Sequence, residues 1–76
     1  MAVQAYILIR TENGKAYHVK KELEFIPGVK QVNRVMGPFD IITLVEAENT
    51  KQIGENILRD IQAVNGIRRT LTCPVI

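Results

Sequence analysis

Apolar and polar residues follow each other along this chain with two different periods, and these periods divide it into segments. From Ala2 to Ile9 the residues are mostly apolar, with β-branched and aromatic side chains, which predicts a strand buried on both sides. A polar run at Thr11–Gly14 ends it. Apolar residues then recur at steps of three and four, which predicts an amphipathic helix. The residues of this stripe are Ala16, Val19, Leu23 and Ile26.

Two further strands are predicted in the middle of the chain. They run from about Val29 to Met36 and from about Asp40 to Ala47. A turn around Gly37 and Pro38 separates them, so we expect the two strands to pair as a hairpin.

A second helix and a last strand complete the pattern. Asn49 or Thr50 can cap this helix, with Gln52 three residues after Asn49 in a capping-box arrangement. The apolar stripe of the helix consists of Ile53, Ile57, Ile61 and Val64. The strand predicted after it runs from Ile67 to Val75.

The exits of the two predicted helices resemble each other. Pro27-Gly28-Val29 follows the first helix and Asn65-Gly66-Ile67 follows the second. Glycine tolerates the left-handed backbone that closes a helix, so both segments predict a helix end, a tight turn and the start of a strand. The order β-α-β-β-α-β with right-handed crossovers predicts a ferredoxin-like α+β fold, a four-stranded antiparallel sheet with two helices on one face. We expect residues 1–76 to form a single domain.

The size and composition of the chain favour self-association. A domain of 76 residues hides only about 60% of the surface that its unfolded chain exposes. One cysteine, Cys73, allows no intrachain disulfide, and one His with one Cys does not make a metal site. Oligomerisation is then the favoured source of extra stability. The strand patterns also favour self-association. Both sides of the first and third predicted strands are apolar, and an uncovered apolar sheet face marks an interface. We therefore expect a face-to-face sheet dimer; the alternative is that these residues are simply exposed.

Other features bear on location and on partners. The formal charge of +2 does not predict binding to nucleic acid. No apolar run approaches the roughly 20 residues that span a bilayer, and the first residues lack the pattern of a secretory signal. We expect a cytoplasmic protein without membrane contact.

The sequence lacks the residues that several kinds of binding and catalytic site require. The segment after the first strand has no cysteine pair for a metal chaperone, and the third strand has no aromatic residue for stacking RNA bases. No glycine-rich loop precedes either helix, so no nucleotide cofactor is expected. His18 is interpreted as a solvated residue on the polar helix face and Cys73 as a small structural residue. We expect no catalytic residue and no metal ligand, although an enzyme that needs no cofactor stays an alternative.

The most distinctive local segment joins the two middle strands, Val35–Ile41. As a plain hairpin turn it uses the backbone freedom of Gly37 and the fixed φ of Pro38. As a ligand loop it lets a small molecule approach the main chain at Gly37, while the Asp40 carboxylate accepts from an ammonium group. An α-amino acid carries both a carboxylate and an ammonium group.

With this loop the chain resembles the effector-binding domain of the Lrp/AsnC family of transcription regulators. The matching motifs are Gly37-Pro38-Phe39-Asp40 and Gly66-Ile67-Arg68-Arg69-Thr70-Leu71-Thr72, together with the turn Pro27-Gly28-Val29. The chain departs from those regulators because no helix-turn-helix segment precedes its first strand. It therefore resembles a stand-alone version of the module, without direct DNA binding.

The resemblance implies a dimeric α+β barrel, whose dimers assemble into octamers or decamers and bind an amino acid between neighbouring dimers. It implies ligand binding by Gly37, Pro38, Phe39 and Asp40, and by Thr70 and Thr72 across the interface. Our hypothesis is that amides near Gly37 and a threonine hydroxyl bind the carboxylate, while Asp40 binds the ammonium group.

The resemblance also suggests a role and a partner. We expect a free amino acid, for which an apolar one is a guess, and a module that co-assembles with a full-length Lrp/AsnC regulator. The alternatives are a cofactor-free enzyme on a dimeric α+β barrel and a purely structural oligomerisation domain. An ACT-type regulatory domain has the same strand order, with Asn13-Gly14 as a faint match to its ligand loop.

Overall fold

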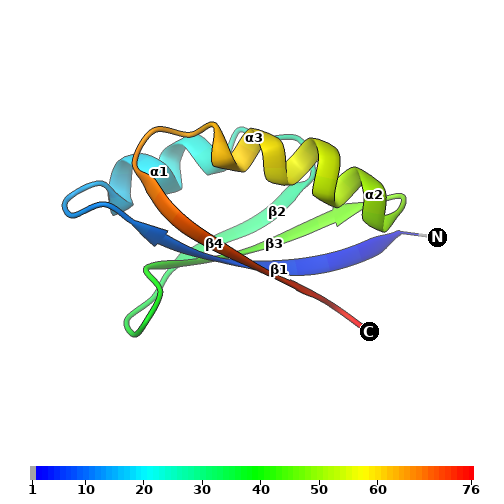
Figure 1. The fold of residues 1–76 in the computed structure, drawn as a ribbon, viewed down its shortest axis with the longest axis horizontal. Coiled ribbons are helices and arrows are strands. Elements are labelled where there is room, and N and C mark those ends of the chain that lie inside the picture. Colours follow the sequence, from blue (N-terminus) through cyan, green and yellow to red (C-terminus); the bar gives the residue numbers. More distant parts are fainter. Residues whose placement is uncertain (1) are drawn as a thin grey trace.

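A computed structural model describes residues 2–76 and shows one sheet covered by helices on one face (Figure 1). The strands are β1 (Val3–Thr11), β2 (Val29–Arg34), β3 (Ile41–Ala47) and β4 (Ile67–Pro74). The first helix is α1 (Ala16–Leu23), and the second is continuous through α2 (Thr50–Gln52), η1 (Ile53–Ile57) and α3 (Leu58–Gln62). The strand order is β2-β3-β1-β4, and each neighbouring pair is antiparallel. The predicted ferredoxin-like βαββαβ arrangement is confirmed.

The core lies between the sheet and the helices. Ala5, Ile7 and Ile9 of β1 are fully buried on the helix-facing side. The two predicted helix stripes contribute the other large part of the core, and its buried helical members are Val19, Leu23, Ile53, Ile57 and Ile61. On the outer side of β1, Tyr6 remains 45% exposed. The expectation that this strand is buried on both sides is thus wrong for the single chain, because both helices cover the same face.

The second helix contains one wide π-helical turn at Ile53–Ile57. Its core isoleucines, Ile53, Ile57 and Ile61, are spaced by four residues. In a regular α-helix each such step would rotate the side chain by about 40° away from the preceding one. A turn with more residues keeps these side chains on the core side. The helix start agrees with the sequence, since the Asn49 side chain accepts from Gln52 N at 2.8 Å.

Gly28 and Gly66 occupy equivalent places at the two helix exits. Their φ angles are +92° and +105°, in the left-handed region that favours glycine. Each packs against the other helix: a Cβ on Gly28 would lie 2.5 Å from Ile57 Cδ1, and one on Gly66 would lie 3.1 Å from Val19 Cγ2. The two matching sequence segments therefore specify close packing as well as two turns.

The carbonyls of the same two glycines connect the helix exits by hydrogen bonds to β3 and to the end of β1. Gly28 O accepts from Glu46 N at 2.9 Å, and Gly66 O accepts from Glu12 N at 2.8 Å. The ladder register then shifts at Lys30 in β2 and at Arg68 in β4, two residues after each glycine. The two halves thus repeat both the turn and the irregularity that follows it.

Two strand ends differ from the prediction by two residues. β1 continues to Thr11, beyond Ile9, and β2 ends at Arg34, before Met36. Both ends lie beside the β2–β3 hairpin, at the left-hand end of the molecule in Figure 1. Within residues 2–76, no helix is long and apolar enough to cross a bilayer.

Candidate functional site

The hairpin loop Gly37–Asp40 is attached to the sheet through its last residue. Asp40 N donates to Ile9 O of β1 at 2.9 Å, and Val35 N donates to Asp40 O at 2.9 Å. Gly37 is exposed and has φ +142°, which a residue with a side chain rarely adopts. The loop therefore has a fixed base at Asp40 and an open tip at Gly37.

The Asp40 side chain is anchored by the end of β1. Its Oδ2 atom accepts from Thr11 N at 2.7 Å and from Thr11 Oγ1 at 3.1 Å. Thr11 is buried, with 7% of its surface exposed, and Asp40 is half-buried. No hydrogen bond from residues 2–76 reaches Asp40 Oδ1. Because a carboxylate offers about four acceptor positions, Asp40 can still bind a donor from outside the chain.

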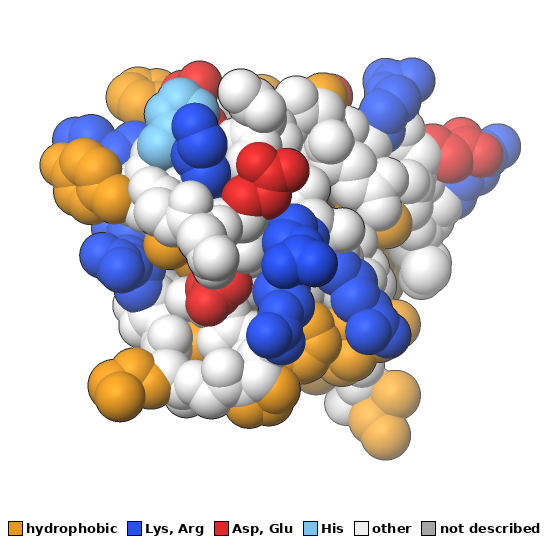
Figure 2. All heavy atoms as spheres, turned by 60° about the vertical axis from the view of Figure 1, so that its left-hand side comes forward, with side chains coloured by type: hydrophobic (Ala, Val, Ile, Leu, Met, Phe, Trp, Pro, Cys, Tyr) orange, Lys and Arg blue, Asp and Glu red, His pale blue; other side chains and the backbone are white. Residues whose placement is uncertain are grey.

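A basic side chain contacts the loop from the outer sheet face. Arg10 Nη1 donates to Pro38 O, and Arg10 lies opposite Arg69 in the β1–β4 ladder. Like charges in such a pair disfavour the folded chain. Figure 2, which brings the left-hand end of Figure 1 forward, shows Lys and Arg side chains gathered on this end with a few acidic ones beside them.

A cavity of ≈ 300 Å³ lies next to Asp40. The end of β1, the β1–α1 turn, the first turn of α1 and the end of β2 form its walls. Its lining residues are Thr11, Glu12, Asn13, Gly14, Ala16, Tyr17, Arg34 and Asp40. Three of them carry charges: the carboxylates of Glu12 and Asp40 and the guanidinium of Arg34. The cavity thus combines both signs of charge with one aromatic ring.

The two candidate threonines lie elsewhere on the chain. Thr70 and Thr72 are opposite Ile9 and Ile7, on the helix-facing side of β4, and Thr70 Oγ1 accepts from Gln62 Nε2 at 3.1 Å. Thr72 lines a separate cavity of ≈ 170 Å³ beneath the second helix. Leu71 faces the other way, as strand alternation predicts. Their meeting with the loop of a neighbouring subunit remains a prediction.

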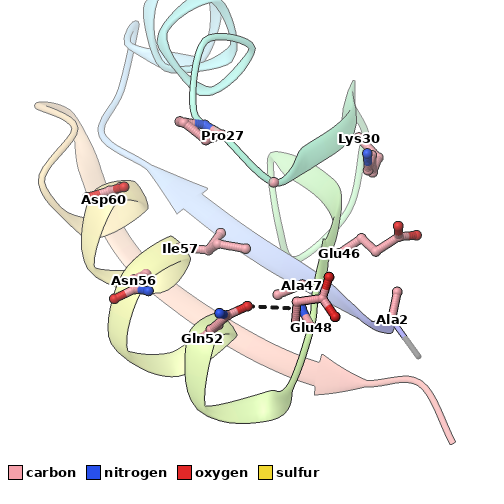
Figure 3. Close-up of a pocket in the computed structure, with 11 residues that line it drawn as sticks. Ala2, Pro27, Lys30, Glu46, Ala47, Glu48, Gln52, Asn56, Ile57 and Asp60 are labelled. Atoms are coloured by element: carbon pink, nitrogen blue, oxygen red, sulfur yellow. Dashed lines mark hydrogen bonds between the residues drawn. The ribbon is translucent and has the colours of Figure 1, made fainter.

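A larger cavity of ≈ 410 Å³ lies at the other end of β3 (Figure 3). Its charged residues are Lys30, Glu46, Glu48 and Asp60. In Figure 3, Asp60 lies on the helix while the Glu46 and Lys30 side chains extend away from it, on the opposite side of the cavity. The Gln52 side chain points inward, but its Oε1 already accepts from Glu48 N at 3.0 Å. The charges of this cavity therefore do not converge on one ligand.

In the part of the chain that the structure describes, neither His18 nor Cys73 has a contact that suggests catalysis. His18 is exposed on α1, and Cys73 is a free, exposed thiol on β4. Within residues 2–76, no three His, Cys, Asp or Glu side chains come together as metal ligands do.

The fold and the loop define an α+β module of ferredoxin-like type, and comparison with known proteins gives its family. The family model described as the Lrp/AsnC ligand binding domain matches residues 4–76. The chain therefore belongs to the Lrp/AsnC ligand-binding domain family.

The relatives carry this module within longer chains. A homocitrate synthase from Sulfurisphaera tokodaii is 36% identical over 75 residues, which cover 97% of this chain and 16% of the enzyme. An uncharacterized HTH-type transcriptional regulator from Pyrococcus furiosus is 28% identical over 95% of this chain and 50% of the regulator. The chain thus spans a minor part of the first relative and half of the second.

Solved structures support the same fold. The crystal structure of FFRP-DM1 is 34% identical, with a TM-score of 0.90 over 97% of this chain and 99% of that chain. A transcriptional regulator from Neisseria meningitidis, solved as a complex with L-Met, has a TM-score of 0.83 over 97% of this chain and 49% of that chain. At 14% identity, this second likeness concerns the fold alone.

Proposed function

We propose that this chain is an amino-acid-binding regulatory module that acts through assembly and not through catalysis. Membership of the Lrp/AsnC ligand-binding domain family supports this proposal. So does the L-Met complex of the Neisseria regulator, which has the same fold. The observation that carries it is the half-buried Asp40 carboxylate, which faces a cavity with one oxygen unengaged. A charged donor such as an ammonium group forms a stronger hydrogen bond with a carboxylate than a neutral donor does.

In the proposed site, Gly37, Pro38, Phe39 and Asp40 come from one subunit and Thr70 and Thr72 from its neighbour. The exposed tip of the loop leaves its amides accessible to a carboxylate. Assembly is supported by the outer sheet face, where Tyr6 and Leu71 are both 45% exposed. We propose a homodimer with its sheets face to face in an α+β barrel, built further into octamers or decamers.

The proposed partner is a full-length Lrp/AsnC regulator in the cytoplasm, which itself contacts the DNA; this module contacts neither DNA nor membrane. A ligand that binds one assembly state more tightly shifts the equilibrium toward it. The match to homocitrate synthase favours a second candidate, a biosynthetic enzyme that the module regulates. The two candidate partners are distinguished by mixing the module with each of them, with and without amino acids. The mass of the particles shows which of the two forms a complex.

A thermal-shift panel of the twenty amino acids tests the proposed function. A ligand of the native state raises the melting midpoint with the logarithm of its saturation, so at least one amino acid should raise it at millimolar concentration. Asp40→Ala should abolish that shift while light scattering still shows the oligomer. If no amino acid shifts the midpoint, the module has another role; if Asp40→Ala breaks the assembly instead, the loop is structural.

A further inference from the structure

The cavity beside Asp40 contains a second charged group, Arg34, that none of the matching sequence motifs includes. Arg34 lies opposite Ile41 in the β2–β3 ladder, so it shares the helix-facing side of the sheet with the core. It lines the cavity together with the first turn of α1 and remains exposed. Its guanidinium makes no hydrogen bond or ion pair within residues 2–76. An unpaired guanidinium at a cavity wall is a ready partner for a carboxylate.

We infer that Arg34 binds the α-carboxylate of the amino acid whose ammonium group Asp40 binds, so that a single chain supplies both charged contacts. This inference rests on the proposed function and adds to it an anchoring residue and the cavity in which the ligand lies. The two groups line one cavity of ≈ 300 Å³, a size that holds an amino acid. The amides near Gly37 and a threonine hydroxyl of the neighbouring subunit then do not have to bind the carboxylate alone.

The first turn of α1 supports the carboxylate end of this arrangement. Ala16 and Tyr17 line the cavity, and no side chain caps the helix at Lys15. The first turn also contains no acidic residue. Its free N–H groups and the positive end of the helix dipole favour an anion there. This contribution adds to that of Arg34 and does not replace it.

Tyr17 provides an apolar wall. Tyr17 is 62% exposed, and Lys21 Nζ lies 5.6 Å from the centroid of its ring. A ligand in the cavity would cover part of the exposed ring and gain apolar contact. This arrangement suits the carbon chain of an amino acid held at its two charged groups.

The remaining charge of the cavity selects among side chains. Two carboxylates, Glu12 and Asp40, face one guanidinium, Arg34. When Asp40 and Arg34 bind the zwitterion, Glu12 is the charged group of the cavity that stays unengaged. It repels an acidic side chain and attracts a basic one. The ligand class is therefore neutral and basic α-amino acids, with aspartate and glutamate the weakest.

The test compares Arg34→Gln with Arg59→Gln, a matched control at an exposed arginine of α3 that lines none of the cavities described above. The twenty amino acids are titrated against both variants and the wild type. Arg34→Gln should lower affinity about tenfold or more, because a hydrogen bond to a charged group is lost. Arg59→Gln should match the wild type. Arg34→Lys, which keeps the charge, should fall between them.

Analogues of the amino acid that binds show which of its groups Arg34 contacts. Its amide, which lacks the carboxylate charge, should bind the wild type weakly and lose little more in Arg34→Gln. If the wild type binds an amino acid and Arg34→Gln binds it within twofold, Arg34 is not the anchor and the proposed function stands without it. If Arg34→Gln weakens the amide as much as the amino acid, its effect is indirect and the inference is overturned. If the wild type binds no amino acid, the proposed function fails first.

Discussion

Asp40 and Thr11 are 29 residues apart in sequence, yet one oxygen of the Asp40 carboxylate accepts from both the N–H and the hydroxyl of Thr11. This pair fixes the carboxylate at the end of β1 and leaves its other oxygen, Oδ1, without a hydrogen bond from residues 2–76. Because Thr11 is buried, the contact also connects the hairpin loop with the core. The candidate ligand residue is thus held in place before any ligand arrives.

Thr11→Val should destabilise the protein while preserving the shape of the side chain. The valine loses the hydroxyl donor and keeps the N–H bond, so we expect a loss of about 1–2 kcal/mol in the free energy of unfolding. Urea unfolding measures it. Thr70→Val is the control, because its hydroxyl bond to Gln62 is exposed, and we expect a change within about 0.5 kcal/mol. Equal losses of stability in both variants would show that the hydrogen bond from the Thr11 hydroxyl to Asp40 stabilises the fold no more than the exposed bond at Thr70 does.

Substitution of the left-handed glycines should separate backbone strain from packing. Gly14, with φ +79°, has open space where a Cβ would lie, so Gly14→Ala should cost only the conformational strain of about 1–2 kcal/mol. At Gly28 the Cβ would overlap Ile57 Cδ1 and approach the Glu46 carbonyl at 3.2 Å. Gly28→Ala should therefore cost about 1–3 kcal/mol more than Gly14→Ala. A loss at Gly28 no larger than at Gly14 contradicts the close packing of the helix exit on Ile57.

The ion pair on α1 should produce a weak pH dependence on the acid side. The Lys20 ammonium, 2.8 Å from the Glu24 carboxylate, lowers the pKa of Glu24 below its ordinary value. A lowered folded-state pKa gives a contribution that is present above the unfolded-state pKa and lost as the pH falls through the folded one. Stability should thus fall slightly over that acidic range, less so in Lys20→Gln. NMR titration of Glu24 measures its pKa in the wild type and in Lys20→Gln. An equal pKa in both proteins would exclude the ion pair with Lys20 as the cause of the lowered pKa.

Leu71→Asp should dissociate the oligomer. Leu71 is exposed on the outer sheet face, and a carboxylate buried there in a sheet-to-sheet contact would be strongly unfavourable. Phe25→Asp is the matched control, because Phe25 is 82% exposed and follows α1 on the opposite side of the sheet. Light scattering should give an oligomer for the wild type and for Phe25→Asp, and monomer for Leu71→Asp. A wild-type monomer at micromolar concentration would contradict the dimer.

The sequence predicts the local features of this fold better than the distant contacts. Asn49 caps the second helix and Gly28 and Gly66 close both helices, because these roles depend on residues a few positions away. Thr11 belongs to a polar run that the sequence pattern places after the end of the first strand. Its burial depends on Asp40, far along the chain, and no local pattern indicates such a bond.

In the candidate site, too, the sequence predicts local features better than contacts between distant residues. The Gly37–Asp40 loop is recognisable from its own residues, whereas Arg34 resembles any solvated charge near a strand end. One signal was available: Arg34 is in phase with Val32, so strand alternation places its side chain toward the helices. A charge on the inward face is unusual enough to mark a candidate. The cavity itself depends on how the start of α1 lies beside the end of β2, which the sequence does not specify.

The most direct test of the central claim is a crystal structure of this protein with the amino acid that gives the largest thermal shift. We expect the amino acid to lie at the loop Gly37–Asp40, with its ammonium group within hydrogen-bond distance of Asp40 Oδ1. Density for the amino acid elsewhere, for example in the cavity beside Thr72 with Asp40 untouched, would contradict it.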